Sequence, residues 1–226
     1  MTKYDWDAIM GSIYEIKIPE SYNEDLAYIH ALICGDGTLV RNGYRIQISD
    51  KNLEMHERII KPKFKRLFGI EIRIVKKGNG WVSEIKSKNL FAYLSDQLKI
   101  PIGEKSHRVT VPNQLFNVAI SVQKSYFQGW MDAEGSVRSR KYKTVITPKI
   151  EFATKSKNVF NGLIRILDLL GKNYGVQLRV WTWKDKKEIF RFELAGPQVV
   201  INYSKFVGFQ HPHKKEKIRK LLINYI

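Results

Sequence analysis

A pattern of apolar residues that ends in an acid followed by glycine occurs twice in this chain. The copies are Ile29–Gly37 and Phe127–Gly135, and their acids, Asp36 and Glu134, lie 98 positions apart. A helical run that stops at a glycine is typical of a helix that ends abruptly. Because the pattern recurs at one fixed offset, we expect a duplicated fold built around two equivalent helices.

Small residues precede each acid at every fourth position, which places them on one face of each expected helix. They are Ala27, Ala31 and Gly35 in the first copy and Ser125, Gly129 and Ala133 in the second. Small side chains permit close helix packing, which would bring the two acids together. Paired carboxylates at two helix C-termini repel each other, so a divalent cation is the expected compensation. A single acid–glycine pair after a helix is more often only a turn, and it is the matched pair that favours a metal site.

The elements around the two copies follow the same order, which predicts the fold class. In the first half we expect helices over 21–35, 52–68 and 90–98 and strands over 44–49, 70–75 and 81–86, after a strand that follows the motif. In the second half we expect helices over 126–133, 158–170, 197–206 and 213–224, with Gly171 ending the helix over 158–170. We expect the strands of this half over 136–140, 145–154, 176–183 and 188–194. This order predicts an α+β fold of two pseudo-twofold-related αββαββα repeats. The expected organisation is an N-terminal extension over 1–20, a first repeat over 21–98, a connector over 99–122 and a second repeat over 123–226.

Composition narrows the class of partner. The chain has 39 lysine and arginine residues against 22 acidic ones, a formal charge of +17, so a polyanion is expected, with nucleic acid ahead of an anionic membrane surface. We see no membrane-length apolar run and no signal segment, so we expect an intracellular, soluble protein in a prokaryotic cytoplasm or an organelle. The single cysteine, Cys34, excludes an internal disulfide and is expected to be buried. His211 and His213 lack the partners that a zinc site needs.

The two motifs resemble the one that gives the LAGLIDADG homing endonucleases their name. In the first copy Leu32, Ile33, Asp36 and Gly37 match, with Ile29 in place of leucine. In the second copy Gly129, Met131, Asp132, Ala133 and Gly135 match, and Glu134 replaces the final acid, an exchange common in that family. Departures are Cys34, where the family often has its first acid, and His30 and Gln128, where it often has alanine. The resemblance extends from residue 21 to the end and is to single-chain members with two motifs.

This resemblance implies a function, a cofactor and a set of site residues. Two four-stranded antiparallel sheets would form a saddle over the major groove of a long, asymmetric double-stranded DNA site bound by a monomer. Asp36 and Glu134, with the backbone at Gly35 and Ala133, would hold Mg²⁺, with Mn²⁺ or Ca²⁺ as alternative occupants. Hydrolysis of one phosphodiester on each strand would leave short 3′ overhangs. Oxygen ligands from carboxylates suit Mg²⁺, which agrees with this expectation.

Further site residues are carried over from the family's pattern. Gln47 aligns with a family position near the reacting water, and Glu151 is its counterpart in the second half. Lys105 and Lys214 are the candidates for a lysine near each scissile phosphate, with Lys215 as the alternative to Lys214. Solvated strand residues and ordinary phosphate contacts are the competing interpretations of these positions.

Basic, polar and aromatic residues at outward strand positions are the expected DNA contacts, since arginine reads guanine and glutamine reads adenine in the major groove. These residues are Arg41, Arg45, Gln47, Arg73, Lys86, Arg138, Arg140, Lys143, Lys149, Gln177, Arg179, Trp181, Trp183 and Arg191. The two tryptophans have an alternative role in covering a sheet edge.

Three functions are compatible with this pattern. The first is a site-specific double-strand DNA endonuclease, encoded by an intron in preference to an intein. The second is an RNA-binding intron maturase, and the third is a DNA-binding regulator of the same fold that has lost cleavage. Both motif acids are present, which favours the endonuclease, because neither alternative needs a metal-binding pair.

Overall fold

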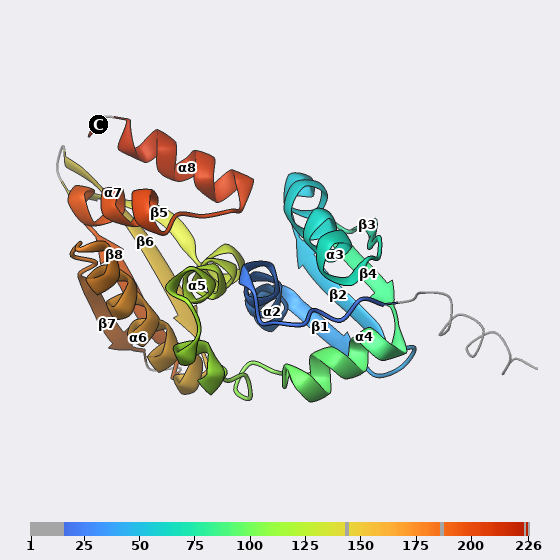
Figure 1. Cartoon of the computed structure of the whole chain (residues 1–226). Helices are drawn as coiled ribbons and strands as arrows, with labels where there is room; N and C mark the ends of the chain where they lie inside the picture. Colours follow the sequence, from blue (N-terminus) through green and yellow to red (C-terminus); the bar gives the residue numbers. More distant parts are fainter. Residues whose placement is uncertain (1–15, 143–144, 186–187, 224, 226) are drawn as a thin grey trace, which may run out of the picture. The chain divides into compact units, whose positions relative to one another are not determined.

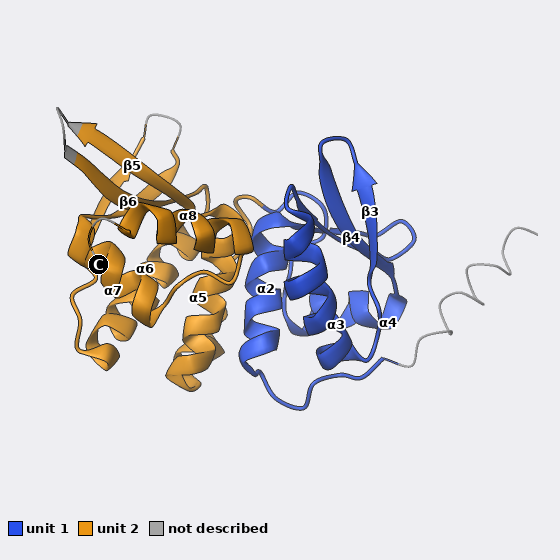
Figure 2. Cartoon of the chain, turned by 90° about the horizontal axis from the view of Figure 1, so that it is seen from above, with its two compact units in different colours: residues 1–105 blue, residues 106–226 orange. Residues whose placement is uncertain are grey.

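The computed structural model describes residues 16–142, 145–185, 188–223 and 225, and these form two compact units (Figures 1 and 2). Unit 1 comprises Met1–Lys105 and unit 2 comprises Ser106–Ile226. Most of the predicted N-terminal extension, residues 1–15, lies outside the described residues.

Unit 1 begins with the helix that carries the first motif. Its elements are α2 (Glu24–Asp36), β1 (Gly37–Val40), β2 (Arg45–Asp50), the π-helix Met55–Ile60, α3 (Lys61–Phe68), β3 (Arg73–Lys77), β4 (Gly80–Lys86), α4 (Lys88–Ala92) and the π-helix Tyr93–Gln97. Asn23 caps α2 by accepting a 3.0 Å hydrogen bond from the backbone N–H of Leu26, and Gly69, at φ 71°, ends α3.

Unit 2 repeats this order and adds one more helix at its end. After the 3₁₀ helix Asn113–Asn117 come α5 (Ile120–Glu134), β5 (Ser136–Tyr142), β6 (Val145–Thr154), α6 (Lys157–Tyr174), β7 (Val180–Lys184), β8 (Phe190–Ala195), α7 (Pro197–Phe206) and α8 (Pro212–Leu222). Ser156 caps α6 by accepting a 3.1 Å hydrogen bond from the N–H of Val159.

Each unit contains one four-stranded antiparallel sheet, and the two sheets have the same strand order. The orders are β1-β2-β4-β3 and β5-β6-β8-β7, so the second and fourth strands of each repeat are the central pair (Figure 1). Two four-stranded antiparallel sheets with flanking helices confirm the predicted α+β fold class.

The inner face of each sheet packs on its own motif helix. In unit 1 the buried side chains are aliphatic, with Ile46 and Ile48 on β2 and Ile85 on β4. In unit 2 aliphatic residues such as Ile150 and Leu194 are joined by aromatic ones: the rings of Phe152 and Phe192 stack with centroids 5.0 Å apart. The period-2 alternation predicted for β2 is confirmed at Ile46 and Ile48.

Tyr44 departs from that predicted alternation. It is the first residue of the predicted strand over 44–49, but it lies in the turn before β2 at φ 46° and is 40% exposed. Its ring makes an edge contact with Phe91, with centroids 5.6 Å apart. Strand β2 therefore starts at Arg45, one residue later than predicted, and its first buried residue is Ile46.

Gly171 does not end its helix, which corrects a second expectation. Helix α6 continues to Tyr174 and ends at Gly175, at φ 62°. A Cβ at Gly171 would lie 3.0 Å from the carbonyl oxygen of Val176, so the glycine makes room for the chain as it folds back. The helix has 18 residues. No helix within the described ranges combines the length and apolar character that crossing a bilayer requires.

The division between the units lies inside the segment 99–122 that we predict to be a connector. Its first part is attached to unit 1, where Gly103 N donates to Leu39 O at 3.0 Å. Its later part is attached to unit 2, where Val111 N donates to the side chain of Asn158 at 2.7 Å. Gly162 on α6 accommodates this contact, because a Cβ there would lie 2.5 Å from the Val111 side chain.

We expect His30 to make stability depend on pH. Its ring is buried in α2, with Nδ1 2.8 Å from the Tyr22 hydroxyl, and burial lowers its pKa from the ordinary 6.5 to about 3. Between these values the unfolded chain takes up a proton that the folded protein excludes. The free energy of unfolding therefore falls as the pH drops below about 6.5, by up to about 1.4 kcal/mol per pH unit from this group.

Urea unfolding at a series of pH values between 7 and 4 checks this expectation. His30→Gln should flatten the pH dependence, while His107→Gln, at an exposed position, should leave it as in the wild type. Equal slopes in the wild type and His30→Gln would contradict the assignment.

Candidate functional site

Each motif helix turns directly into the first strand of its sheet at a glycine. Helix α2 ends at Asp36, and Gly37 begins β1, where its N–H donates to Ile33 O. A Cβ on Gly37 would lie 2.6 Å from the Cα of Ile33, which is too close for any side chain. Gly37 therefore lets the strand leave the helix without a loop, and this fixes Asp36 at the corner.

The second motif makes the same corner. Gly135 N donates to Met131 O at 3.0 Å, and a Cβ on Gly135 would lie 2.4 Å from that oxygen. Glu134 is the last residue of α5 and is exposed, whereas Asp36 is half-buried. The structure therefore places one carboxylate at the C-terminal end of each motif helix.

A lysine ammonium lies at each of these helix ends. In unit 1, Lys105 Nζ donates to Gly35 O at 2.5 Å. In unit 2, Lys214 Nζ donates to the carbonyl oxygens of Met131, Asp132 and Ala133 at 3.1, 2.5 and 3.1 Å. The last carbonyls of a helix attract cations. These two lysines are the predicted candidates, and each lies beside the motif of its own repeat.

Gln47 and Glu151 occupy equivalent positions in the two sheets. Gln47 on β2 pairs with Thr38, which lies two residues after Asp36. Glu151 on β6 pairs with Ser136, which lies two residues after Glu134. Each predicted residue is therefore one strand away from its motif corner, on the face opposite the core.

A second acid next to each of these residues was missed by the sequence analysis. Glu84 on β4 accepts a 2.8 Å hydrogen bond from Gln47 Nε2, and Glu193 on β8 pairs with Glu151 across the strands. Both residues lie at strand positions of β4 and β8 that alternate away from the core, so the alternation could have indicated them. They were missed because the strong positive charge of the chain favoured basic residues as candidates.

Glu193 and Glu151 hold Lys149 between them. Lys149 Nζ lies 2.5 Å from Glu151 Oε1 and 3.0 Å from Glu193 Oε2, and the Lys149 side chain is only 13% exposed. Burial opposes its charge, but the two carboxylates outweigh burial and raise the pKa of Lys149 above its ordinary value. Arg138 also pairs with Glu151, at 3.1 Å. Several of the predicted DNA-binding cations therefore already have anionic partners within the protein.

The remaining predicted contacts are distributed over both sheets. Arg45, Arg73 and Lys86 lie on strands of unit 1 and Arg140 and Arg191 on strands of unit 2, whereas Arg41 lies in the turn after β1. Lys143 lies outside the described residues.

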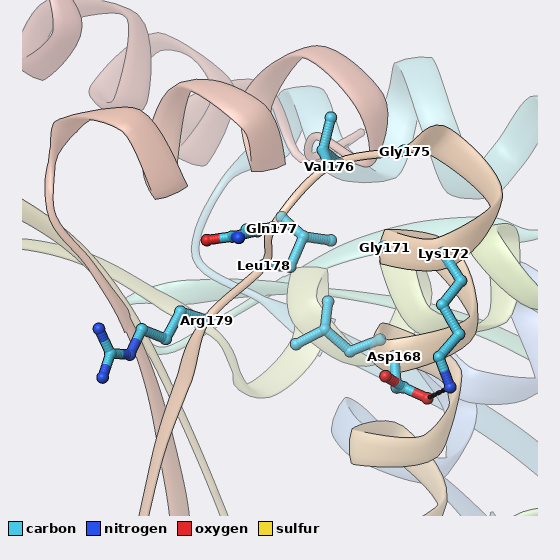
Figure 3. A pocket seen from close by; sticks show the side chains of 9 residues that line it. Asp168, Gly171, Lys172, Gly175, Val176, Gln177, Leu178 and Arg179 are labelled. Carbon is cyan, nitrogen blue, oxygen red and sulfur yellow. Dashed lines mark ion pairs between the residues drawn. The ribbon is translucent and has the colours of Figure 1, made fainter.

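Gln177 and Arg179 precede strand β7, which begins only at Val180, so their predicted position on the strand is wrong. With the end of α6 they line a hollow of about 550 Å³, where Asp168 and Lys172 form a 2.7 Å ion pair (Figure 3). Residues 176–179 connect the end of α6 to the sheet, so strand β7 starts only at Val180.

Trp181 and Trp183 share the outward face of edge strand β7, as the alternation predicts. They are 56% and 42% exposed, and the Arg179 guanidinium lies 5.2 Å from the centroid of Trp181. Trp181 pairs with Glu193 and Trp183 with Arg191. Both rings are therefore accessible on the sheet face that carries Lys149, Glu151 and Glu193. This position is compatible with both predicted roles, cover of the sheet edge and contact with DNA.

The motif end of each unit presents oxygen donors of the kind that hard divalent cations prefer. In unit 1 these are the Asp36 carboxylate and the Gly35 carbonyl, and in unit 2 they are the Glu134 carboxylate and the Ala133 carbonyl. Both carbonyls already attract a lysine ammonium, which shows that the helix ends favour positive charge. Among the described residues, no group of three or more histidine, cysteine, aspartate or glutamate side chains could hold a metal by itself.

Each of the two αββαββα repeats therefore opens with a helix that ends in an acid–glycine corner. Residues 121–207 match the family model of the LAGLIDADG-like domain. The chain is 26% identical over 186 residues to the homing endonuclease I-ApeI of Aeropyrum pernix, a match that covers 80% of this chain and 79% of the relative. It is also 27% identical over 217 residues to a probable translation initiation factor IF-2 of Methanocaldococcus jannaschii, where it covers 92% of this chain but spans only 17% of the relative.

Solved structures show the same fold. The structure of I-DmoI in complex with DNA and Mn has a TM-score of 0.59 at 19% identity, covering 84% of this chain and 99% of that one. I-DmoI with DNA and Ca gives the same TM-score at 18% identity, covering 89% and 98%. Together with the sequence matches, this confirms the predicted resemblance to the LAGLIDADG homing endonucleases.

We expect removal of the Glu193 carboxylate to strengthen DNA binding. Glu193→Gln takes away one of the two anions that neutralise Lys149, so this cation becomes available to a phosphate. The affinity for a non-specific duplex should rise several-fold, and the slope of log K against log salt should steepen by about 1.

Fluorescence anisotropy with a labelled duplex over a salt series measures both quantities. Glu57→Gln removes the same charge from an exposed position in the π-helix Met55–Ile60, away from Lys149, and serves as the control. Equal slopes for the two variants would show that Glu193 does not restrain Lys149.

Proposed function

We propose that this protein is a site-specific double-strand DNA endonuclease that depends on a divalent metal. The observation that carries the proposal is the repeated helix end, at which an acid–glycine corner, a lysine ammonium and an outward Gln47 or Glu151 lie together in each unit. One such set in each repeat suits a reaction that cuts each DNA strand once. The sequence similarity to the homing endonuclease I-ApeI supports this proposal. So does the fold shared with I-DmoI, whose structure is described in complex with DNA and Mn.

In this proposal Asp36 and Glu134, with the backbone at Gly35 and Ala133, hold the metal. A bound divalent cation, with Mg²⁺ as the expected ion, stabilises charge on the phosphate oxygens during hydrolysis. Structures of I-DmoI are described with Mn, with Ca and, for one variant, with Mg, which supports an oxygen site that accepts several divalent ions.

In this proposal the protein's side chains position the reacting groups and neutralise the charge of the phosphate. Lys105 and Lys214 place a positive charge beside each motif, where it balances the phosphate to be cut. Glu84 fixes the amide of Gln47, because the bond from Nε2 turns the Gln47 carbonyl oxygen away from Glu84 and suits it to accept from a water. Cleavage of one phosphodiester on each strand is proposed to leave short 3′ overhangs.

Binding is assigned to the outward faces of the two sheets. The net charge of +17 favours a polyanion, and the basic residues on the strands favour contact with phosphates and groove edges. A single chain with two non-identical repeats suits a monomer on an asymmetric site inside the cell. An intron-encoded origin is part of the proposal.

Asp36→Asn and Glu134→Gln should each lower the single-turnover cleavage rate by about a hundredfold or more while changing DNA affinity by less than about threefold. The carboxylates contribute to the reaction, whereas phosphate contacts elsewhere supply most of the affinity. Gel analysis of a plasmid carrying a site selected from a randomised library measures cleavage, with Mg²⁺ or with chelator, and anisotropy measures affinity.

Asp168→Asn controls for the loss of one negative charge and should cut like the wild type. Chelator-resistant cleavage, or full activity in both motif variants, would reject the metal-dependent mechanism. Tight binding without cleavage by the wild type would favour the regulator of the same fold.

A further inference from the structure

Helix α5 carries two polar side chains, one turn apart, that hold the segment leading into α8. Gln128 Nε2 donates to Val207 O at 2.5 Å, and Gln128 Oε1 accepts from Gln210 Nε2 at 3.1 Å. Asp132 Oδ2 accepts from the backbone N–H groups of Gln210 and His211 at 2.9 and 3.0 Å. Residues 207–211 are therefore fastened to the motif helix at both ends.

The Asp132 carboxylate accepts its hydrogen bonds at the start of α8, the helix that carries Lys214. His211 is the N-cap of α8, so the Asp132 carboxylate lies where backbone N–H groups and the helix dipole favour an anion. The Asp132 side chain is 1% exposed, which makes both hydrogen bonds costly to lose.

Lys214 follows three residues after this N-cap, in the first turn of α8. A cation in a first turn is disfavoured by the dipole of its own helix. Its ammonium instead lies on the last carbonyls of α5, including that of Asp132 itself. The carboxylate that fixes the start of α8 therefore also fixes the distance over which Lys214 reaches the motif corner.

The first repeat has neither an aspartate nor a glutamine at the equivalent positions of its motif. At the position equivalent to Asp132 it has Cys34, and at the position equivalent to Gln128 it has His30. Burial raises the pKa of the Cys34 thiol to about 12, against the opposing charge of Lys105, so this side chain stays neutral. Lys105 lies outside the helices and strands, in the segment after Pro101. The two lysines therefore reach equivalent helix ends by different means.

We propose that Asp132 is a positioning residue that sets Lys214 at the motif corner and so controls the cutting of one DNA strand. This rests on the proposed function, in which Lys214 serves one strand and Lys105 the other. The first acid of the second motif thus has a role separate from that of Glu134, and it acts through Lys214.

Strand-resolved, single-turnover cleavage of a duplex with a different fluorophore on each strand tests the proposal. Asp132→Ala should slow one strand by at least about tenfold relative to the other, and Lys214→Met should slow the same strand. The double variant should be no slower than Lys214→Met alone, because both changes remove one positioned ammonium. Asp132→Asn, which keeps an oxygen acceptor, should restore most of the rate.

Cys34→Ala is the matched control, since it alters the equivalent position of the first repeat and should leave the ratio of the two strand rates unchanged. A general loss of folding would slow both strands equally. Equal slowing of both strands by Asp132→Ala, or additive effects in the double variant, would overturn the proposal.

A second measurement does not need cleavage. Acetylation by acetic anhydride, followed by mass spectrometry, compares Lys214 with exposed Lys215 in the same protein. Lys214 should be protected in the wild type, and Asp132→Ala should bring its reactivity towards that of Lys215. Unchanged protection would reject the role of Asp132 even if the wild type cut no DNA, whereas absent cleavage with lost protection would reject only the proposed function.

Discussion

The corner between each motif helix and its first strand is the constraint on which the remaining structure depends. Gly37 and Gly135 approach the preceding helical turn so closely that a Cβ would lie within 2.6 Å of backbone atoms. This allows helix and strand to be joined without an intervening loop, so the acid before each glycine has little freedom. The lysine contacts and the outward strand residues are all arranged relative to that corner.

Periodicity and glycine positions were sufficient to predict the duplicated α+β fold. The αββαββα order, the fold class and the buried alternation at Ile46 and Ile48 are confirmed, because these patterns reflect local geometry and a single core face. The errors lie where tertiary contact overrides local preference. Gly171 is a helix residue because the returning chain needs its space, and Tyr44 is in a left-handed turn that its neighbours stabilise.

The functional site was less accessible to sequence reasoning. The family motif indicated Asp36 and Glu134, and the fold places Lys105 and Lys214 at the corresponding helix ends. The partners of the basic residues could not be inferred, because pairing such as that of Glu193 with Lys149 depends on strand register. Net charge counts cations, but it does not show which of them are already neutralised.

The unlike residues at matching positions of the two repeats have an evolutionary consequence. In a homodimer every substitution appears twice, so an improvement to one half is imposed on the other. A fused chain removes that coupling, and Cys34 and Asp132 show that the halves have diverged at a buried motif position. Laboratory recombination that exchanges one repeat would therefore have to transfer each lysine together with the contacts that support it.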